Sequence, residues 1–225
     1  MNTKSLTLFI SILFMSVIIL AGCSKWSNTA RGVAIGTGGG AAAGAVIGKT
    51  LGNTAAGAIA GAAVGGTVGA IIGRNMDQKA EELEEELEGV TVQRVEEGIA
   101  VSFDSGILFA FDSAELRADA RENLEKLSTI INRDEDTILL IVGHTDTTGD
   151  ADYNQGLSEQ RAQSAADYMI SEGLVESRVQ TEGRGETEPI ADNSTEAGQQ
   201  ENRRVEVAIY ARPEYIERLQ EEEES

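Results

Sequence analysis

The run Ile138–Val142, five consecutive branched apolar residues, constrains the fold of this chain more than any other segment. Such a run is typical of a strand in the middle of a sheet that is covered on a face, because a half-exposed strand alternates apolar and polar residues. We therefore predict a buried strand over Thr137–His144 and, after a polar loop, a helix over Leu157–Glu172. A central strand followed by a covering helix indicates an α/β domain.

Two charged residues lie close to the carboxyl end of this predicted strand. Asp146 follows the strand directly, and Arg161 lies early in the helix into which the loop Thr147–Asp150 leads. Ligands of open α/β layers tend to bind at the carboxyl ends of strands. A carboxylate and a guanidinium held apart there would grip a small zwitterion, the first binding its ammonium and the second its carboxylate. The alternative is an ordinary salt bridge that supports the loop.

The segment around these two residues belongs to a longer pattern of three separated motifs. These are G-H-T-D at 143–146 with N-x-x-L-S-x-x-R-A at 154–162, then G-R-G-E-x-x-P at 183–189, then N-R-R-V-E-V at 202–207. In this order they resemble the OmpA-like peptidoglycan-binding domain shared by OmpA, Pal and MotB-type proteins. The resemblance covers roughly residues 98–211.

The resemblance implies a ligand and the residues that bind it. In the family, the Asp and Arg at the positions of Asp146 and Arg161 hold the D-centre of meso-diaminopimelate in the peptidoglycan stem peptide. A second group is expected to shape the pocket less directly: Thr148, Asn154, Asn202, Arg203 and Asp112. From the residues alone, Asp112 is most simply the N-cap of a helix, because Asp112-Ser113-Ala114-Glu115 looks like a capping box.

The remaining pattern of the domain predicts the order β-α-β-α-β-β in a two-layer α/β sandwich. Val90–Val95 and Ile99–Phe103 alternate around Glu96-Glu97-Gly98 and predict a hairpin. A helix follows, with five apolar residues at helical spacing: Leu116, Ala120, Leu124, Leu127 and Ile131. After the central strand and second helix, Val179–Gly183 and Val205–Tyr210 predict the remaining strands.

Composition and residue types exclude several classes of function. The formal net charge of −20 argues against a nucleic-acid partner and against adsorption to anionic surfaces, so recognition has to come from a local pocket. His144 is the only histidine, and one His without a second His or a usable Cys makes a poor metal site. We interpret it as a strand-end residue hydrogen-bonded within the fold. With no evident catalytic constellation, we predict no enzyme, no metal and no cofactor.

The start of the chain predicts export and lipid anchoring. Met1–Lys4 is a short basic start, and Leu6–Leu20 is an apolar run of signal-peptide length. Leu20-Ala21-Gly22-Cys23 looks like a bacterial lipobox, which predicts cleavage before Cys23 and acylation of its thiol. Cys23 is the sole cysteine, so no internal disulfide is expected. Ser24 replaces the Asp that signals inner-membrane retention in enteric bacteria, which favours the outer membrane.

Between anchor and domain, glycine recurs every fourth residue at 32–52 and again at 57–73. On a helix this spacing forms one ridge along which another backbone approaches closely. We predict two helices of about 20 residues that fold back as a hairpin near Gly52-Asn53-Thr54. The segment resembles the glycine zipper of YiaD-type lipoproteins. Three interpretations stay open: a membrane-embedded hairpin, a self-associating hairpin in the periplasm, and a disordered linker.

Two acidic segments flank the predicted domain. The second zipper helix is expected to continue past Arg74 and to end near Gly89, with Met76, Ala80, Leu83 and Leu87 at coiled-coil spacing. This stretch is interpreted either as a solvated acidic spacer helix or as a short dimer seam. The glutamate-rich end at 213–225 is expected to be solvated and mobile.

These predictions divide the chain into six parts: signal peptide 1–22, lipidated tether 23–30, glycine-zipper hairpin 31–74, acidic spacer helix 75–89, OmpA-like domain 90–212 and acidic tail 213–225. The predicted function is an outer-membrane lipoprotein that tethers the envelope to peptidoglycan, with the domain in the periplasm and self-association through the zipper left open. The alternative is a membrane-inserted glycine-zipper oligomer, a pore or assembly factor, that uses the domain only as a wall anchor.

Overall fold

The computed structural model describes residues 53–110, 112–133 and 135–225. The predicted signal peptide, Cys23 and the first glycine run lie outside these residues. None of the helices in the described ranges is both long enough and apolar enough to cross a membrane.

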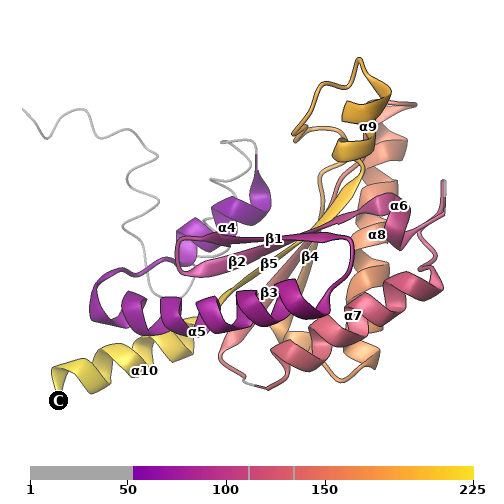
Figure 1. The fold of residues 1–225 in the computed structure, drawn as a ribbon. Helices are drawn as coiled ribbons and strands as arrows, with labels where there is room; N and C mark the ends of the chain where they lie inside the picture. Colours follow the sequence, from indigo (N-terminus) through magenta and orange to yellow (C-terminus); the bar gives the residue numbers. More distant parts are fainter. Residues whose placement is uncertain (1–52, 111, 134) are drawn as a thin grey trace, which may run out of the picture. The chain divides into compact units, whose positions relative to one another are not determined.

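One five-stranded mixed sheet forms the centre of the domain (Figure 1). Its spatial order is β1 (Val90–Val95), β2 (Gly98–Asp104), β5 (Arg204–Ala211), β3 (Thr137–Gly143) and β4 (Val179–Gly183). Only β3 and β4 are parallel neighbours, and the other pairs in this sheet are antiparallel. The predicted buried strand is confirmed, since β3 lies inside the sheet and six of its seven residues are buried. The predicted α/β class is confirmed as well, although the chain places a short helix, α9 (Glu196–Asn202), between β4 and β5 where the predicted order has two successive strands.

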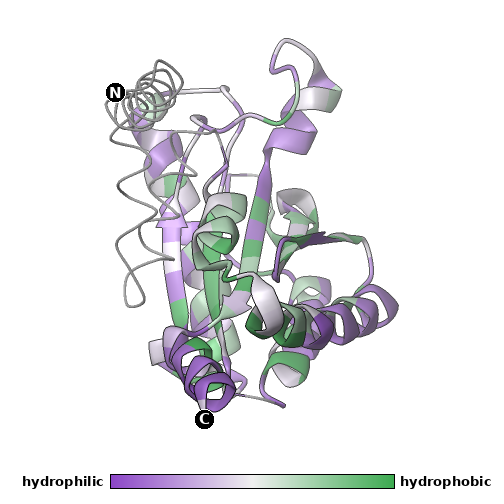
Figure 2. Cartoon of the chain, turned by 90° about the vertical axis from the view of Figure 1, so that its left-hand side faces the viewer, coloured by the Kyte–Doolittle hydropathy of each residue, from purple (hydrophilic) through white to green (hydrophobic). Residues whose placement is uncertain are grey.

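Three helices cover one face of this sheet: α5 (Gly66–Glu86), α7 (Ala118–Ile131) and α8 (Ala151–Ser171). Successive side chains of a strand point to opposite faces, so every second residue of β3 and β5 joins the core under these helices. The members of this set are Leu139 and Ile141 of β3 and Val205, Val207, Ile209 and Ala211 of β5. Figure 2 shows hydrophobic residues along the strands and a largely hydrophilic helix at the C-terminus.

The other face of the sheet is covered by α4 (Thr54–Ala62), which belongs to the second glycine run. Ala55, Ala58 and Ile59 of α4 are buried against a second apolar cluster formed by Leu140, Val142, Ala208 and Tyr210. The predicted two-layer sandwich did not include α4, which covers the second face of the sheet. The second glycine run is also not one helix of about 20 residues, because α4 ends before Gly65 and Gly66, whose φ angles of 70° and 67° break the helix.

The predicted continuation of the zipper helix past Arg74 is confirmed, but both interpretations of its acidic part are wrong. Met76, Ala80, Leu83 and Leu87 are buried in the core of their own chain, where α5 packs on β1 and α7. The apolar stripe therefore faces the sheet and is neither a solvated spacer nor a seam free for a dimer. Gly89, with a φ of 70°, lies just beyond the helix end.

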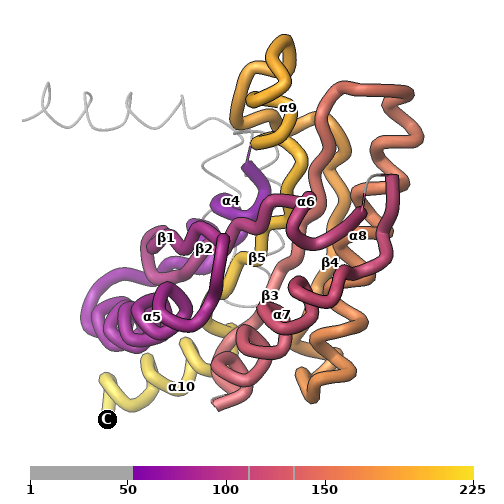
Figure 3. Tube along the Cα trace, turned by 45° about the vertical axis from the view of Figure 1, so that its right-hand side comes forward, coloured from indigo at the N-terminus to yellow at the C-terminus, as the bar shows by residue number. Residues whose placement is uncertain are grey.

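The acidic end of the chain forms α10 (Pro213–Glu224), where a solvated tail had been predicted. Tyr215, Ile216 and Leu219 pack against the main core, and Asn75 of α5 donates a hydrogen bond of 3.1 Å to the Tyr215 hydroxyl. α10 lies beside α5 (Figures 1 and 3). The glutamates of this segment are exposed, and they lie on a helix that packs against α5.

Two helix starts differ from prediction. α7 begins at Ala118 with Arg117 as its N-cap, so Asp112 is not a cap. Asp112 has a φ of 54° and lies in the loop after the short helix α6 (Ser105–Leu108). α8 begins at Ala151, because Asp150 caps it by accepting hydrogen bonds from the amides of Asp152 and Tyr153. Arg161 therefore lies in the middle of α8.

Candidate functional site

The carboxyl end of β3 and the first half of α8 approach each other unusually closely. A Cβ added at Gly143 would lie 2.1 Å from the carbonyl oxygen of Ser158, and one added at Gly183 would lie 2.6 Å from the amide nitrogen of Glu159. Only glycine fits at these strand ends. Because α8 crosses them at this distance, Arg161, one turn after Ser158, is brought to the same end of the sheet as Asp146.

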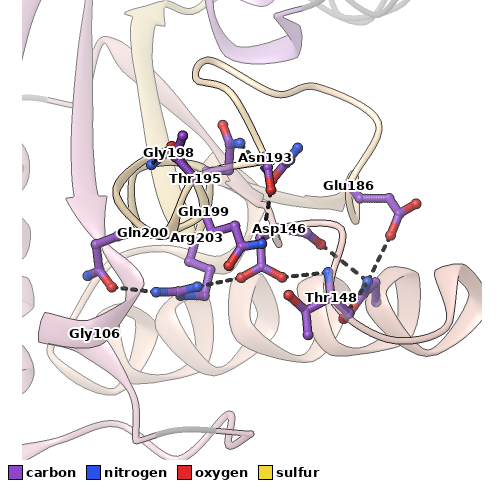
Figure 4. A network of polar contacts seen from close by, with 12 residues as sticks. Gly106, Asp146, Thr148, Glu186, Asn193, Thr195, Gly198, Gln199, Gln200 and Arg203 are labelled. Carbon is purple, nitrogen blue, oxygen red and sulfur yellow. Dashed lines mark hydrogen bonds and ion pairs between the residues drawn. The ribbon is translucent and has the colours of Figure 1, made fainter.

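Asp146 is buried and held by two neighbours in the free protein. Its Oδ1 accepts a hydrogen bond of 2.7 Å from the backbone amide of Thr148, and its Oδ2 forms an ion pair with Arg203 (Figure 4). Burial raises the pKa of Asp146, but the hydrogen bonds from Arg203 and Thr148 outweigh it, so the net pKa lies below its ordinary value. The carboxylate is therefore ionised at neutral pH.

Arg161 is also buried, but its guanidinium is held only on one side. Its Nε donates a hydrogen bond of 3.0 Å to the carbonyl of Ser113, and its Cζ lies 5.3 Å from the centre of the Phe109 ring. In the described part of the chain, neither of its terminal nitrogens has a hydrogen bond or salt bridge. Burial and the nearby charge of Arg203 lower its pKa, while Asp112, Tyr153 and Asp146 act against this.

The alternative of a plain Asp146–Arg161 salt bridge is therefore wrong for the described structure. Asp146 pairs with Arg203, and Arg161 contacts a carbonyl and an aromatic ring. An acidic group and a basic group with open hydrogen-bonding capacity thus lie at one end of the sheet.

Asn154 and Thr148 both lie at this site, as predicted from the resemblance. The amide nitrogen of Asn154 donates to the backbone carbonyls of Asp146 and Thr148, each at 3.2 Å, and to Glu186 at 2.8 Å. These bonds fix the loop between β3 and α8. Glu186 was not among the predicted site residues, although its place in the G-R-G-E motif was a signal for it.

Asn202 and Arg203, although adjacent in the chain, have different contacts. Asn202 is fully buried, and its side chain forms hydrogen bonds with the backbone of Ile190 and Ala191 and with the side chain of Asn193, so it supports the loop next to Arg203. Arg203 binds Asp146 with one nitrogen and Gln200 with another (Figure 4). Gln200 was missed, since an exposed glutamine carries no distinguishing sequence signal.

Asp112 lies near Arg161 and contacts Tyr153 of α8. Its Oδ1 accepts a hydrogen bond of 2.6 Å from the hydroxyl of Tyr153, a half-exposed residue of the first turn of α8. Its charge acts on Arg161 as well. Tyr153 was not predicted as a site residue. Its position directly before Asn154 was the available signal.

His144 differs from its predicted role. Its backbone amide donates to the carbonyl of Arg204 at 2.9 Å, but both ring nitrogens are buried and lack a hydrogen-bond partner among the described residues. Its Nε2 lies 3.9 Å from Glu206 Oε2. Burial, reinforced by the charges of Arg204 and Arg184, holds the pKa of His144 well below 6.5. The ring is therefore neutral at neutral pH.

We expect this buried histidine to make the domain less stable in mild acid. The folded-state pKa lies below the unfolded value near 6.5, so the unfolded chain binds the extra proton and stability falls as the pH drops below 6.5. The slope approaches about 1.4 kcal/mol per pH unit for one such group. Urea unfolding of wild type and His144→Gln between pH 7.5 and 5 checks this. Equal slopes for both proteins would contradict the prediction.

No cluster of three or more potential metal ligands occurs among the residues that the structure describes. A groove of about 530 Å³ runs between α8 and β4, lined among others by Gln160, Gln163 and Thr181. It contains none of the sequence-predicted site residues.

Comparison with known proteins gives one family match in the N-terminal part of the chain and another in the C-terminal part. The model of the OmpA family matches residues 108–203, and a YMGG-like Gly-zipper matches residues 1–77. The outer-membrane lipoprotein YfiB of Pseudomonas aeruginosa is 36% identical over 52% of this chain and 69% of its own length. The "Probable lipoprotein YiaD" of Escherichia coli is 36% identical over 54% of this chain. The chain spans about half the length of the first curated relatives it matches.

Solved structures agree with the fold. The cell wall anchor of the type VI secretion system (T6SS) of Pseudomonas aeruginosa is 30% identical, with a TM-score of 0.52 over 60% of this chain and 96% of that one. The periplasmic domain of Helicobacter pylori MotB, 20% identical over 62% of this chain and 90% of that one, has a TM-score of 0.53 and shares the fold.

The fold and the comparisons together define a chain in which a YMGG-like Gly-zipper precedes a mixed α/β domain of the OmpA type. The chain belongs to the OmpA family. Family membership confirms the prediction that it is not an enzyme.

Proposed function

We propose that this chain is an outer-membrane lipoprotein that tethers the envelope to the cell wall by binding meso-diaminopimelate of peptidoglycan. One observation carries the proposal. Asp146 and Arg161 lie at the same end of the sheet, and the terminal nitrogens of Arg161 have no hydrogen bond or salt bridge with any described residue. A zwitterion with an ammonium and a carboxylate fits this pair.

The surroundings suit each half of the ligand. The Asp146 carboxylate is ionised and oriented by the Thr148 amide, and its remaining lone pairs are available to an ammonium. The Arg161 guanidinium lies over the Phe109 ring and donates from Nε to the Ser113 carbonyl, so the N–H groups of its terminal nitrogens are left as donors for a carboxylate. Partial burial strengthens both contacts relative to water.

The relatives support the same reading. YfiB is an outer-membrane lipoprotein, and the secretion-system protein with this fold is a cell wall anchor. The strongly acidic composition disfavours a general electrostatic attraction to an anionic wall polymer, so binding has to depend on a pocket.

Calorimetric titration of the protein with a stem peptide that contains meso-diaminopimelate tests the ligand. Co-sedimentation with insoluble peptidoglycan tests the tether, and release of muropeptides during the incubation would indicate an enzyme instead. We expect saturable binding and no release. A matched peptide with lysine in place of diaminopimelate keeps the side-chain ammonium and lacks the carboxylate beside it. It is the control and is expected to bind much more weakly, because Arg161 then has no carboxylate to bind.

The membrane anchor has its own test. Because Cys23 is the only thiol and closes a lipobox-like sequence, Cys23→Ala is expected to abolish acylation and to release the protein from the membrane fraction. Buried acyl chains contribute about 0.8 kcal/mol per methylene, so more than one chain is needed for a stable anchor. Metabolic labelling with a fatty acid is the measurement. Label on the Cys23→Ala protein would disprove the assignment.

A further inference from the structure

The helix α4, which lies in the second glycine run, is docked on the sheet by a set of buried polar contacts, here called the polar lock, as well as by apolar contacts. The Thr54 amide donates a hydrogen bond of 3.0 Å to Glu188 Oε2, and the Thr54 hydroxyl donates one of 2.6 Å to Glu188 Oε1. The same hydroxyl accepts a bond of 2.7 Å from Arg184 Nε. All three residues are buried.

This lock recognises the first turn of α4 specifically. The first amides of a helix have no partner within it, and a carboxylate there is also favoured by the helix dipole. Asn53 caps one amide, that of Ala56, at 2.7 Å, and Glu188 binds that of Thr54 from 134 residues away. Arg184 in turn is paired with Glu182 and with Glu188. Undocking α4 would leave Arg184 and Glu188 without their buried hydroxyl partner.

The loop that holds this lock also builds the candidate ligand site. Arg184 and Glu188 face α4, while Gly185 and Glu186 between them face β3 and α8. The Gly185 carbonyl accepts from the Thr145 amide at 2.8 Å, directly before Asp146. Glu186 accepts from Asn154 at 2.8 Å (Figure 4).

This loop cannot shift freely on the site side. The Gly185 amide donates to the Ser158 hydroxyl at 2.9 Å, and Gly185 has a φ of 50°. A Cβ added there would lie 3.1 Å from the amide nitrogen of Gln155. Arg184 and Glu188 are therefore connected, through the contacts of Gly185 and Glu186, to the backbone next to Asp146 and to Asn154.

We propose that α4 is a latch: its docking through Thr54 holds the Gly183–Pro189 loop, and through it Asp146 and Asn154, in the geometry that binds ligand. Thr54 and Glu188 are then positioning residues for a site that they do not touch. The inference rests on the proposed function, because the coupled ligand is the diaminopimelate stem peptide. It makes the junction between zipper and domain a part of wall recognition.

Coupling of this kind is reciprocal. If docked α4 favours ligand binding, bound ligand has to favour docked α4 by the same factor. Stem peptide is therefore expected to slow hydrogen exchange of the α4 amides, although no residue of α4 belongs to the site. Thr54→Val, which keeps the shape and removes the hydroxyl, is expected to weaken stem-peptide binding about fivefold, the lower end of common coupling strengths.

The experiment measures hydrogen exchange and calorimetric affinity of the full chain in detergent, with and without the diaminopimelate stem peptide. Thr54→Ser retains a hydroxyl and is expected to bind as wild type does. Thr67→Val is the matched control, because it removes another threonine–glutamate hydrogen bond at an exposed position of α5, which covers the opposite face of the sheet from α4. It is expected to leave affinity unchanged.

The outcomes separate the two proposals. If wild type binds the peptide but the exchange of α4 amides does not change, the latch is overturned and the tether stands. If wild type does not bind the peptide at all, the proposed function fails and the latch with it. Should Thr54→Val not fold, exchange in the wild type alone decides, with Glu188→Gln as the second variant.

Discussion

Asp146→Ala and Arg161→Ala are each expected to weaken binding of a diaminopimelate stem peptide at least about tenfold while the domain stays folded. A hydrogen bond to a charged group contributes roughly 1.5–3 kcal/mol, and removing one partner leaves the opposite charge of the ligand unpaired in a partly dry site. Asp146→Ala also leaves Arg203 without its ion-pair partner. The double variant is expected to lose less than the sum, because both residues act on one zwitterion.

Calorimetric titration measures these affinities, with circular dichroism as the check on folding. Asp152→Ala and Arg121→Ala are matched controls, since both side chains are exposed on helices and neither contacts the site residues. Wild-type affinity in both single variants with an unchanged spectrum would remove the basis for the proposed function. A loss confined to one of them would instead indicate a ligand with a single charge.

Gly143→Ala is expected to destabilise the domain by about 3 kcal/mol or more, the upper range for overpacking of a tightly packed site. The new Cβ would lie 2.1 Å from the carbonyl oxygen of Ser158. That oxygen belongs to the backbone of α8, so no side-chain rotation relieves the contact. The helix would have to move away from β3, which would also separate Arg161 from Asp146.

Gly156→Ala is the matched control for this prediction. Gly156 lies in the same helix, and a Cβ there meets nothing within 4 Å. Because alanine is the better helix former, this variant is expected to be more stable by about 0.5–1 kcal/mol. Urea unfolding measures both changes. A Gly143→Ala protein as stable as wild type would show that β3 and α8 do not depend on their close approach.

The sequence predicted β3, the hairpin β1–β2 and the location of Asp146 and Arg161, because these depend on local patterns. An apolar run between polar residues identifies a buried strand wherever it occurs. The motif around 143–162 then indicated which charged residues lie near its end. Local pattern was sufficient for the elements that carry Asp146 and Arg161.

Contacts between residues far apart in the chain were not predictable from local patterns. Met76, Ala80, Leu83 and Leu87 have a spacing that suits a dimer seam as well as a face packed on the domain's own sheet. The pairing of Asp146 with Arg203 joins residues 57 positions apart, and no spacing rule selects Arg203 over other arginines. Asp112 resembled a cap because Glu115 follows it by three, yet its φ of 54° places it in a loop.

Because α4 packs on the sheet, the folded domain begins at Asn53, and this limits the length of chain between the domain and a lipid anchor at Cys23. If Cys23 is held by lipid, the docked domain begins at Asn53, only 30 positions further along the chain. Fully extended, a chain of this length spans at most about 100 Å, and any regular structure within it shortens that span. Had the domain begun at residue 90, the same calculation would allow about 230 Å. In the proposed tether, the position of α4 thus sets an upper bound on the length of chain between the membrane and the domain that binds the wall.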